Sequence, residues 1–339
     1  MVKQSTIIRG KAPLRVSFAG GGTDVSPYLE EFGGCVLSCT IAKHVYASVE
    51  INNNSSIIVQ SLDYGETFQA KNGDKLEYDG KLDLAKATLK NIGINEGCKI
   101  TIRSDAPPGS GLGASASMAT VMIGVLLEWK DHKITRYELA ELAYKLEREE
   151  LKIKGGKQDQ YAAAFGGFNF IQFYRDYTIV NPLRISPEII NELTYRGVLC
   201  YTKRSIEGSD IIDDQINSCL TGKSDVIESL HKAKVHAMEM KDALLLGRID
   251  KFGEILHESW ENKKHFSSMI TNPLIDEIYE TARKNGALGG KLLGAGGGGY
   301  LFFISEPDKR NQLVEAMRNM GVQTESLLIE KEGLQTWRV

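Results

Sequence analysis

Alternating apolar and polar positions mark the first part of the chain as rich in β-strands. Residues 12–20 and 44–51 alternate or run apolar as strands do, and 55–63 followed by 66–70 has the pattern of a hairpin. Residues 98–106 form a further predicted strand that leads directly into a glycine-rich stretch. The pattern therefore favours a strand-rich layer in this half of the chain.

Helical periodicity begins directly after that glycine-rich stretch. Residues 115–133 have the length and periodicity of a helix, and 135–151 predict an amphipathic helix. Thr135 followed by Glu138 predicts a capping box at the start of the second helix. Two further predicted strands follow, at 166–174 and 177–185.

The pattern changes near Pro187, where we place the boundary between a first domain, 1–187, and a second, 188–339. The predicted elements of the second domain are a strand at 196–202, helices at 225–247, 248–266 and 272–286, two strands around the glycine turn in 289–305, a helix at 308–321 and a strand at 323–330. This order is typical of a small α+β sandwich.

Composition adds the expectation of an ordinary globular protein. Of the 339 residues, 42% are hydrophobic and 25% charged, and the formal net charge is -3. No whole-chain field would draw the protein to nucleic acid or to anionic lipid. Residues 1–20 lack a signal peptide, and no apolar run reaches the roughly 20 residues of a membrane span. We therefore expect a cytoplasmic protein without nucleic-acid or membrane partners.

The cysteines fit the same expectation. The chain has five, an odd number without a CxxC pair, which suits free thiols in a reducing compartment. Cys35 and Cys39 have no second pair of ligands beside them, so we interpret them as small core residues rather than as a metal site.

The glycine-rich stretch, residues 107–117, reads PPGSGLGASAS and predicts an anion site. Spaced glycines let successive backbone N–H groups turn toward one point, and the helix that follows adds its own free N–H groups and the positive end of its dipole. Nucleotide phosphates are the usual anion at such a site. A glycine-rich turn that merely ends a strand is the alternative interpretation.

Two other phosphate-binding motifs are disfavoured. GSGLGA fits the dinucleotide pattern, but a second predicted helix follows Glu128 where that fold needs a strand. Gly290 and Lys291 resemble part of a P-loop, but no glycine precedes them at the right distance and no Ser or Thr follows.

Three motifs together resemble those of the GHMP kinases. They are KAPLRVSFAGGGTD at 11–24, PPGSGLGASAS at 107–117 and KLLGAGGGGYLFF at 291–303. The resemblance implies a two-domain α+β fold, with an N-terminal domain like ribosomal protein S5 domain 2 and a C-terminal ferredoxin-like α/β sandwich. It also implies ATP and Mg²⁺ as cofactors and an active site between the domains.

The resemblance assigns the central motif to the phosphates of ATP. The residues it implies are Pro108, Gly109, Ser110, Gly111, Leu112, Gly113, Ala114 and Ser115. Ser115 and a glutamate on the following helix would hold Mg²⁺, and Glu147 is the glutamate most similar in position. Glu149 and Glu150 are alternatives for the magnesium ligand. In the other interpretation, all three glutamates belong to a solvated run of charged residues without a ligand role.

Asp159 is the catalytic residue that the resemblance implies, in the segment GGKQDQYAAAFGG. A carboxylate there can orient the acceptor hydroxyl and accept its proton while phosphate contacts hold the γ-phosphoryl group in line. Lys157 would hold Asp159 ionised or contact the phosphate. Without the resemblance, an aspartate in a loop is usually a turn former.

The first motif bears on the substrate. Glycines at 20–22 replace larger polar residues that contact the sugar in galactokinases, so they widen the pocket. The GGGTD form is similar to that of bacterial D-glycero-D-manno-heptose 7-phosphate kinases and of fucokinase-type kinases. The substrate residues that the resemblance implies here are Arg15, Gly21, Gly22, Thr23 and Asp24.

A second candidate for the substrate lies in the second domain. Lys203, Arg204 and Ser205 follow a strand end and precede a predicted helix that contains Gln215, which predicts a clamp for a distal phosphate. An exposed polar helix start is the alternative interpretation.

The resemblance implies an ATP-dependent kinase that phosphorylates the anomeric C1 hydroxyl of a sugar. Heptose 7-phosphate would give the 1,7-bisphosphate, a precursor of nucleotide-activated (GDP-) heptose for cell-surface glycan. The alternatives are a fucokinase-like or other sugar 1-kinase and, in a different class, a non-catalytic ligand sensor. The expected partners are the sugar phosphate and ATP, and a homodimer is an open alternative to a monomer.

Overall fold

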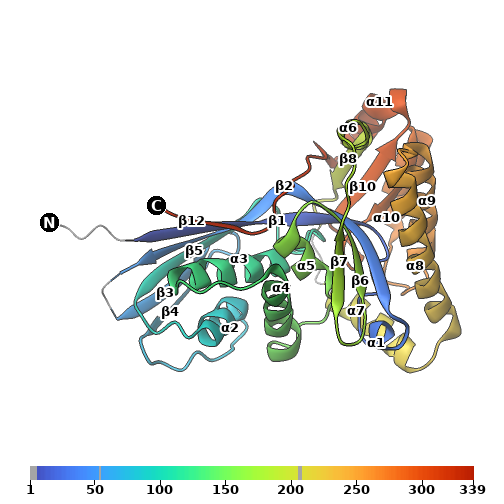
Figure 1. The fold of residues 1–339 in the computed structure, drawn as a ribbon. Coiled ribbons are helices and arrows are strands. Elements are labelled where there is room, and N and C mark those ends of the chain that lie inside the picture. The colour runs from blue at the N-terminus through green and yellow to red at the C-terminus, as the bar shows by residue number, and fades with distance from the viewer. Residues whose placement is uncertain (1–5, 53–54, 205–207) are drawn as a thin grey trace.

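The chain folds into two units side by side, each built on one antiparallel or mostly antiparallel sheet (Figure 1). The computed structural model describes residues 6–52, 55–204 and 208–339. In these ranges helices α2 to α5 cover one face of the first sheet, and the long helices α8 and α9 of the second unit also contact the first sheet, α8 at β1 and β2 and α9 at β1.

The first sheet has eight strands in the order β12-β1-β2-β5-β3-β4, with β6 on β2 and β7 on β6. Only the β3–β5 pairing is parallel among the pairings of the described strands. The strands are β1 (Ile7–Ala19), β2 (Gly34–Ile51), β3 (Ser56–Ser61), β4 (Glu66–Lys71), β5 (Cys98–Ser104), β6 (Phe168–Phe173), β7 (Thr178–Pro182) and β12 (Gln335–Arg338). Strand β2 begins ten residues before the predicted strand because it pairs with β6 in its first half and β5 in its second.

The helices of this unit are α1 (Tyr28–Phe32), α2 (Asp83–Ile92), α3 (Ala114–Trp129), α4 (Arg136–Tyr144) and α5 (Gln158–Phe165). The capping box of Thr135 and Glu138 is confirmed at the start of α4. The single helix expected over 135–151 is interrupted, because a π-turn at Lys145–Glu150 follows α4. The wider turn lets Leu146 and Glu147 both face the interior.

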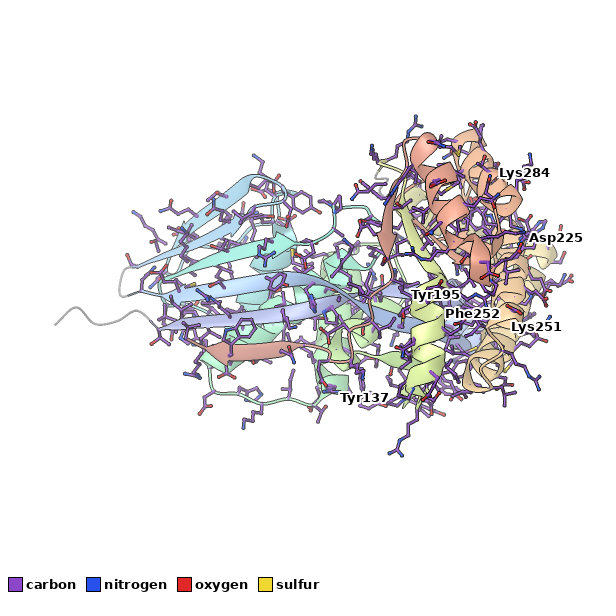
Figure 2. All side chains as sticks on the ribbon, turned by 90° about the horizontal axis from the view of Figure 1, so that it is seen from above. Tyr137, Tyr195, Asp225, Lys251, Phe252 and Lys284 are labelled. Atoms are coloured by element: carbon purple, nitrogen blue, oxygen red, sulfur yellow. The ribbon has the colours of Figure 1, made fainter. Side chains whose placement is uncertain are left out.

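The second unit confirms the predicted ferredoxin-like sandwich. Its four antiparallel strands lie in the order β11-β8-β10-β9. The elements are α6 (Pro187–Arg196), β8 (Gly197–Tyr201), α7 (Ser209–Leu220), α8 (Ser224–Leu245), α9 (Ile249–Lys263), α10 (Pro273–Lys284), β9 (Ala287–Leu292), β10 (Tyr300–Ser305), a 3₁₀ turn (Pro307–Lys309), α11 (Arg310–Asn319) and β11 (Gln323–Ser326). Figure 2 shows Asp225, Lys251 and Lys284 on the side of this unit that faces away from the first sheet.

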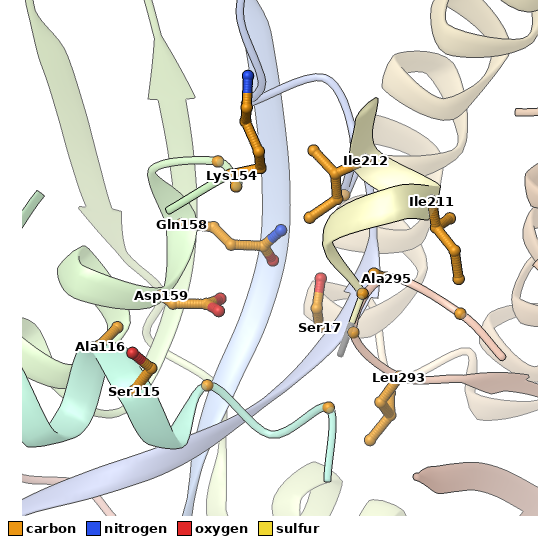
Figure 3. A pocket seen from close by; sticks show the side chains of 18 of the residues that line it. Ser17, Ser115, Ala116, Lys154, Gln158, Asp159, Ile211, Ile212, Leu293 and Ala295 are labelled. Atoms are coloured by element: carbon orange, nitrogen blue, oxygen red, sulfur yellow. The ribbon is translucent and has the colours of Figure 1, made fainter. Parts of the chain in front are cut away.

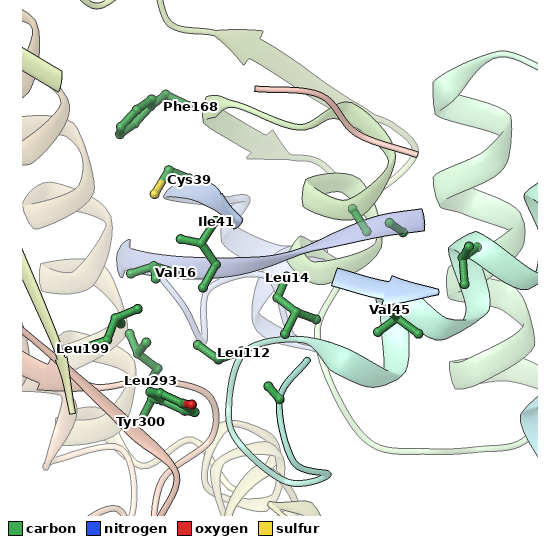
Figure 4. Close-up of a cluster of buried hydrophobic side chains, with 14 of the residues drawn as sticks. Leu14, Val16, Cys39, Ile41, Val45, Leu112, Phe168, Leu199, Leu293 and Tyr300 are labelled. Carbon is green, nitrogen blue, oxygen red and sulfur yellow. The ribbon is translucent and has the colours of Figure 1, made fainter. Parts of the chain in front are cut away.

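One hydrophobic core extends through both units. Leu14 and Val16 of β1 belong to the same buried cluster as Leu199 of β8 and Tyr300 of β10, and Figure 4 shows these side chains around Leu112. Each of them is at most 2% exposed. The glycine-rich stretch that contains Leu112 is therefore anchored where the two sheets meet.

The end of the described chain returns to the first sheet. After β11, residue Ile329 bridges to Ile41 of β2, and β12 pairs with β1. The division at residue 187 stays a prediction; α6 begins there, but β12 lies in the first sheet.

The structure bears on two further expectations. All five cysteines are free thiols, and Cys35 and Cys39 are both buried. Among the described residues, no helix has the length and apolar character needed to cross a membrane.

Candidate active site

The three glycine-rich motifs meet at one cavity of about 530 Å³ between the two units. Gly21 and Gly22 come from the first motif, Gly109 to Ser115 without Leu112 from the second, and Lys291, Gly294 and Gly296 from the third. Figure 3 shows Ser115, Gln158 and Asp159 pointing into this space, with α7 and Leu293 on the opposite side. Residues from both ends of the sequence thus form one site.

The central motif forms a tight turn into the N-terminus of α3. Gly111 has φ +79°, and a Cβ there would lie 2.6 Å from the Leu293 carbonyl oxygen, so glycine is required on both counts. The Tyr300 N–H donates to the Ser110 carbonyl at 3.0 Å. The third motif therefore packs directly on the backbone of the second, which leaves the other face of the loop toward the cavity.

Arg15 connects Asp159 with the glycine loop. Its Nε lies 2.7 Å from Asp159 Oδ1 and its Nη2 lies 2.9 Å from Oδ2, while Nη1 donates to the Gly111 carbonyl at 2.5 Å. The Arg15 side chain is 5% exposed and that of Asp159 is 21% exposed, so the arginine is shielded from solvent while the carboxylate stays accessible from the cavity. Arg15 also lines the cavity, so its predicted contact with substrate stays a prediction, while its guanidinium orients the Asp159 carboxylate.

Ser115 and Glu147 lie together on the cavity wall. The Ser115 hydroxyl donates to Glu147 Oε1 at 2.6 Å, and Gln160 Nε2 donates to Oε2 at 2.5 Å. Of the three glutamates left open by the sequence, Glu149 is exposed, and Glu150 accepts from Tyr78, Lys90 and Asn91 away from this site. The π-turn aims Glu147 inward.

Asp24 is buried beside Asp159. Its carboxylate accepts from the Gly22 and Gln158 backbone N–H groups, each at 3.0 Å, and from Gln158 Nε2 at 3.2 Å. Burial, opposed by these hydrogen bonds, raises the pKa of Asp24 above its usual value, and the charge of Asp159 adds to the rise. Thr23 lies behind the wall and donates to the Gly20 carbonyl.

Three other predicted residues lie outside the cavity wall. Lys157 Nζ lies 3.4 Å from Glu141 Oε1 and 4.5 Å from the centre of the Tyr144 ring, so its ammonium is directed away from Asp159. Lys203 and Arg204 are exposed and do not line the cavity. Ser205 falls outside the described residues.

Two buried lysines lie on the cavity wall, and neither was predicted as a site residue: Lys291 begins the third motif, whereas Lys263 belongs to none of the three motifs. Lys263 Nζ donates to the carbonyls of Leu292 at 3.1 Å and Gly294 at 2.6 Å, and Lys291 Nζ donates to the Phe18 carbonyl at 3.1 Å. Burial, together with the nearby charge of Arg15, lowers the pKa of Lys291 to about 7. Burial, together with the charges of Lys291 and Arg15, lowers the pKa of Lys263 well below its usual range.

Lys291 makes stability depend on pH. Its pKa falls from 10.5 in the unfolded chain to about 7 in the folded one, so between these values the unfolded state binds more protons and the folded state gains stability as pH rises. Relative to Lys291→Met, the wild-type free energy of unfolding should rise by on the order of 4 kcal/mol from pH 7 to 10.5. Urea unfolding of both proteins across this range measures the difference, and parallel profiles would contradict it.

Family models match both units of the chain. The model of the GHMP kinases N terminal domain matches residues 82–167, and that of the GHMP kinases C terminal domain matches residues 240–323. These ranges include the glycine loop, Glu147 and Asp159 in the first unit and the third glycine motif in the second.

Individual proteins are similar over nearly the full length. D-glycero-alpha-D-manno-heptose 7-phosphate kinase of Campylobacter jejuni is 38% identical and covers 98% of this chain and 99% of that protein. The crystal structure of a D-glycero-D-manno-heptose 1-phosphate kinase from Bacteroides thetaiotaomicron is 35% identical, with a TM-score of 0.82 over 98% of this chain and 99% of that one. The L-fucokinase/L-fucose-1-P guanylyltransferase of Bacteroides fragilis is 25% identical over 99% of this chain and 39% of that protein.

The predicted family is thereby confirmed. The match in sequence, the two matched domains and the shared fold agree with the assembly of the three motifs around one cavity. The chain belongs to the GHMP kinase family of ATP-dependent phosphotransferases.

Proposed function

We propose that the protein transfers the γ-phosphoryl group of ATP to the C1 hydroxyl of D-glycero-D-manno-heptose 7-phosphate, giving the 1,7-bisphosphate. The observation that carries the proposal is the contact between Asp159 and the glycine loop: a Cβ on Gly113 would lie 3.3 Å from Asp159 Cγ. A carboxylate at that position adjoins the backbone N–H groups that would bind the phosphates of ATP.

Three parts of the site would have distinct roles in phosphoryl transfer. The loop N–H groups and the N-terminus of α3 bind the polyphosphate and fix its orientation. Asp159, oriented by Arg15, accepts the proton of the acceptor hydroxyl as the hydroxyl oxygen bonds to the γ-phosphorus, and the bond from that phosphorus to the β–γ bridging oxygen breaks to release ADP. The wall formed by the second unit keeps bulk water from the γ-phosphoryl group.

Mg²⁺ fits beside this loop. The Ser115 hydroxyl and the Glu147 carboxylate are hard oxygen donors 2.6 Å apart on the cavity wall, a set that suits Mg²⁺ bound also through phosphate oxygens and water. When bound, Mg²⁺ supplies positive charge against the phosphate oxygens of ATP. Gln160 fixes the second oxygen of Glu147 and so keeps the first directed at Ser115.

The heptose is supported by the relatives and by the shape of the first motif. Two relatives that match nearly the whole chain are named as heptose phosphate kinases, although the names place the phosphate at different positions. Gly21 and Gly22 line the cavity beside Asp24, in the motif whose GGGTD form is similar to that of the heptose phosphate kinases.

A coupled assay of ADP release tests the proposal with ATP, Mg²⁺ and a panel of free and phosphorylated heptoses and hexoses. We expect kcat/KM for heptose 7-phosphate to exceed that for fucose or galactose at least about 100-fold, because the acceptor's phosphate adds charge-assisted hydrogen bonds. The product should carry an acid-labile phosphate at C1.

Two results would contradict the proposal. Rapid turnover of free fucose with none of heptose 7-phosphate would favour a fucokinase-like activity, as the similarity to the Bacteroides fragilis protein allows. If none of the acceptors in the panel supports ADP release although an ATP analogue binds, the result would favour the ligand sensor.

A further inference from the structure

A phosphorylated acceptor needs a cation at the far side of the cavity from the ATP loop. Five cationic side chains line the cavity in the described chain: Arg15, Arg148, Lys154, Lys263 and Lys291. A cation that binds the dianionic phosphate must be free to do so while the C1 hydroxyl of the acceptor lies at Asp159. This inference rests on the proposed function and concerns the same site.

Three of these cations are already committed within the protein. Arg15 pairs with Asp159, and the two lysines of the second unit, Lys263 and Lys291, are held by backbone carbonyls and are at most 8% exposed. Their pKa values are lowered by burial, which disfavours a permanent charge. Two cations remain: Arg148 in the π-turn, and Lys154 on the segment between the π-turn and α5.

Arg148 organises that segment. Its guanidinium donates to the carbonyls of Gly156 at 3.3 Å, Ile153 at 3.2 Å and Lys154 at 3.3 Å. A Cβ on Gly155 would lie 2.5 Å from the guanidinium, so the chain wraps closely around it. In the described residues Arg148 has no carboxylate within ion-pair distance, and its charge adds to the positive potential of this wall.

Lys154 is the accessible cation on this wall. Its ammonium lies 3.3 Å from Asp213 Oδ1 on α7, and the two side chains are 49% and 43% exposed. An exposed pair of this kind contributes little to stability, so a phosphate can replace Asp213 as the partner at low cost. Figure 3 shows Lys154 and Ile212 of α7 at the rim of the cavity beyond Gln158, with the Lys154 ammonium pointing away from Asp159.

We propose that Lys154 binds the distal phosphate of the acceptor, exchanging Asp213 for the phosphate, while Arg148 positions the segment that carries it. The segment runs directly into α5, so the phosphate-binding group and Asp159 belong to one short stretch of chain. This fixes the separation between the distal phosphate and the reacting hydroxyl, and it makes Lys154 a specificity-determining residue.

The test compares phosphorylated with free heptose in steady-state kinetics of Lys154→Met and of a matched control, Lys152→Met, an exposed lysine on the same segment. Loss of a charge-assisted contact to phosphate should reduce the preference for the phosphorylated acceptor, as a ratio of kcat/KM values, about 10- to 100-fold. The reduction should arise in KM. The control should keep the wild-type ratio.

Asp213→Asn separates binding from a structural role. If Asp213 competes with the phosphate, this variant should lower KM for the phosphorylated acceptor about two- to threefold. If it instead raises KM as much as Lys154→Met does, the ion pair holds α7 in place and the inference is wrong. An unchanged preference in Lys154→Met would also overturn it, whereas a wild-type protein that does not use heptose 7-phosphate would refute the proposed function itself.

Discussion

Asp159→Asn is expected to lower kcat about 100- to 10,000-fold, with little change in KM for ATP. The amide keeps the size of the side chain but cannot accept the proton of the acceptor hydroxyl. It also offers Arg15 one oxygen in place of two, so the guanidinium loses half of its bidentate partner. Coupled ADP release at saturating ATP and acceptor measures the effect.

Asp176→Asn is the matched control for this experiment. Asp176 is exposed in the turn between β6 and β7, remote in sequence from the glycine motifs, and the same change of charge there should leave kcat at the wild-type value. Thermal unfolding of both variants shows whether each is folded. A folded Asp159→Asn protein with near-wild-type kcat would end the assignment of Asp159 as the proton acceptor.

Glu147→Gln should raise the Mg²⁺ concentration needed for half-maximal rate about 10- to 100-fold, and it should also lower kcat. The substitution preserves shape and removes the negative charge beside Ser115, so the Ser115–Glu147 pair loses most of its attraction for a divalent cation. Titration with Mg²⁺ at fixed ATP, together with Mg²⁺-dependent binding of an ATP analogue, separates affinity from rate.

Glu149→Gln provides the comparison within the same π-turn. Glu149 is exposed, whereas Glu147 is fully buried, so removing the charge at 149 should leave the Mg²⁺ titration unchanged. Equal effects of the two variants would show that the charge of the whole turn matters, and would refute a specific role for Glu147.

Motifs with several constraints at once were predictable from the sequence. The glycine loop and its helix could be placed because spaced glycines before a periodic segment have few other uses. The third glycine motif, between two strands, was placed by the family resemblance. The order of strands and periodic helices predicted a small α+β sandwich for the second unit, and the family resemblance added that it is ferredoxin-like. Thr135 and Glu138 predicted the start of a helix, because a capping box depends only on residues close together in sequence.

Contacts between distant residues were not predictable in the same way. Arg15 and Asp159 are 144 positions apart, and nothing in either segment indicates that the arginine binds the aspartate rather than a ligand. Lys157 shows the opposite case: it is two residues from Asp159, but Glu141 on α4 draws its ammonium away. The inward direction of Glu147 depends on a π-turn that the regular periodicity of 135–151 does not signal.

The pairing of β12 with β1 makes the second unit an insertion in the first rather than an appendage. The polypeptide enters the second unit after β7 and comes back along β2 before its last strand, so two separate tethers hold that unit. Because the second unit is connected to the first at both ends, the two units that form the cavity can move apart only over a limited distance. It also means that losing four residues, Gln335–Arg338, would expose the backbone of β1 as a free edge for pairing with other molecules, while the contacts of residues 328–330 with β2 would remain.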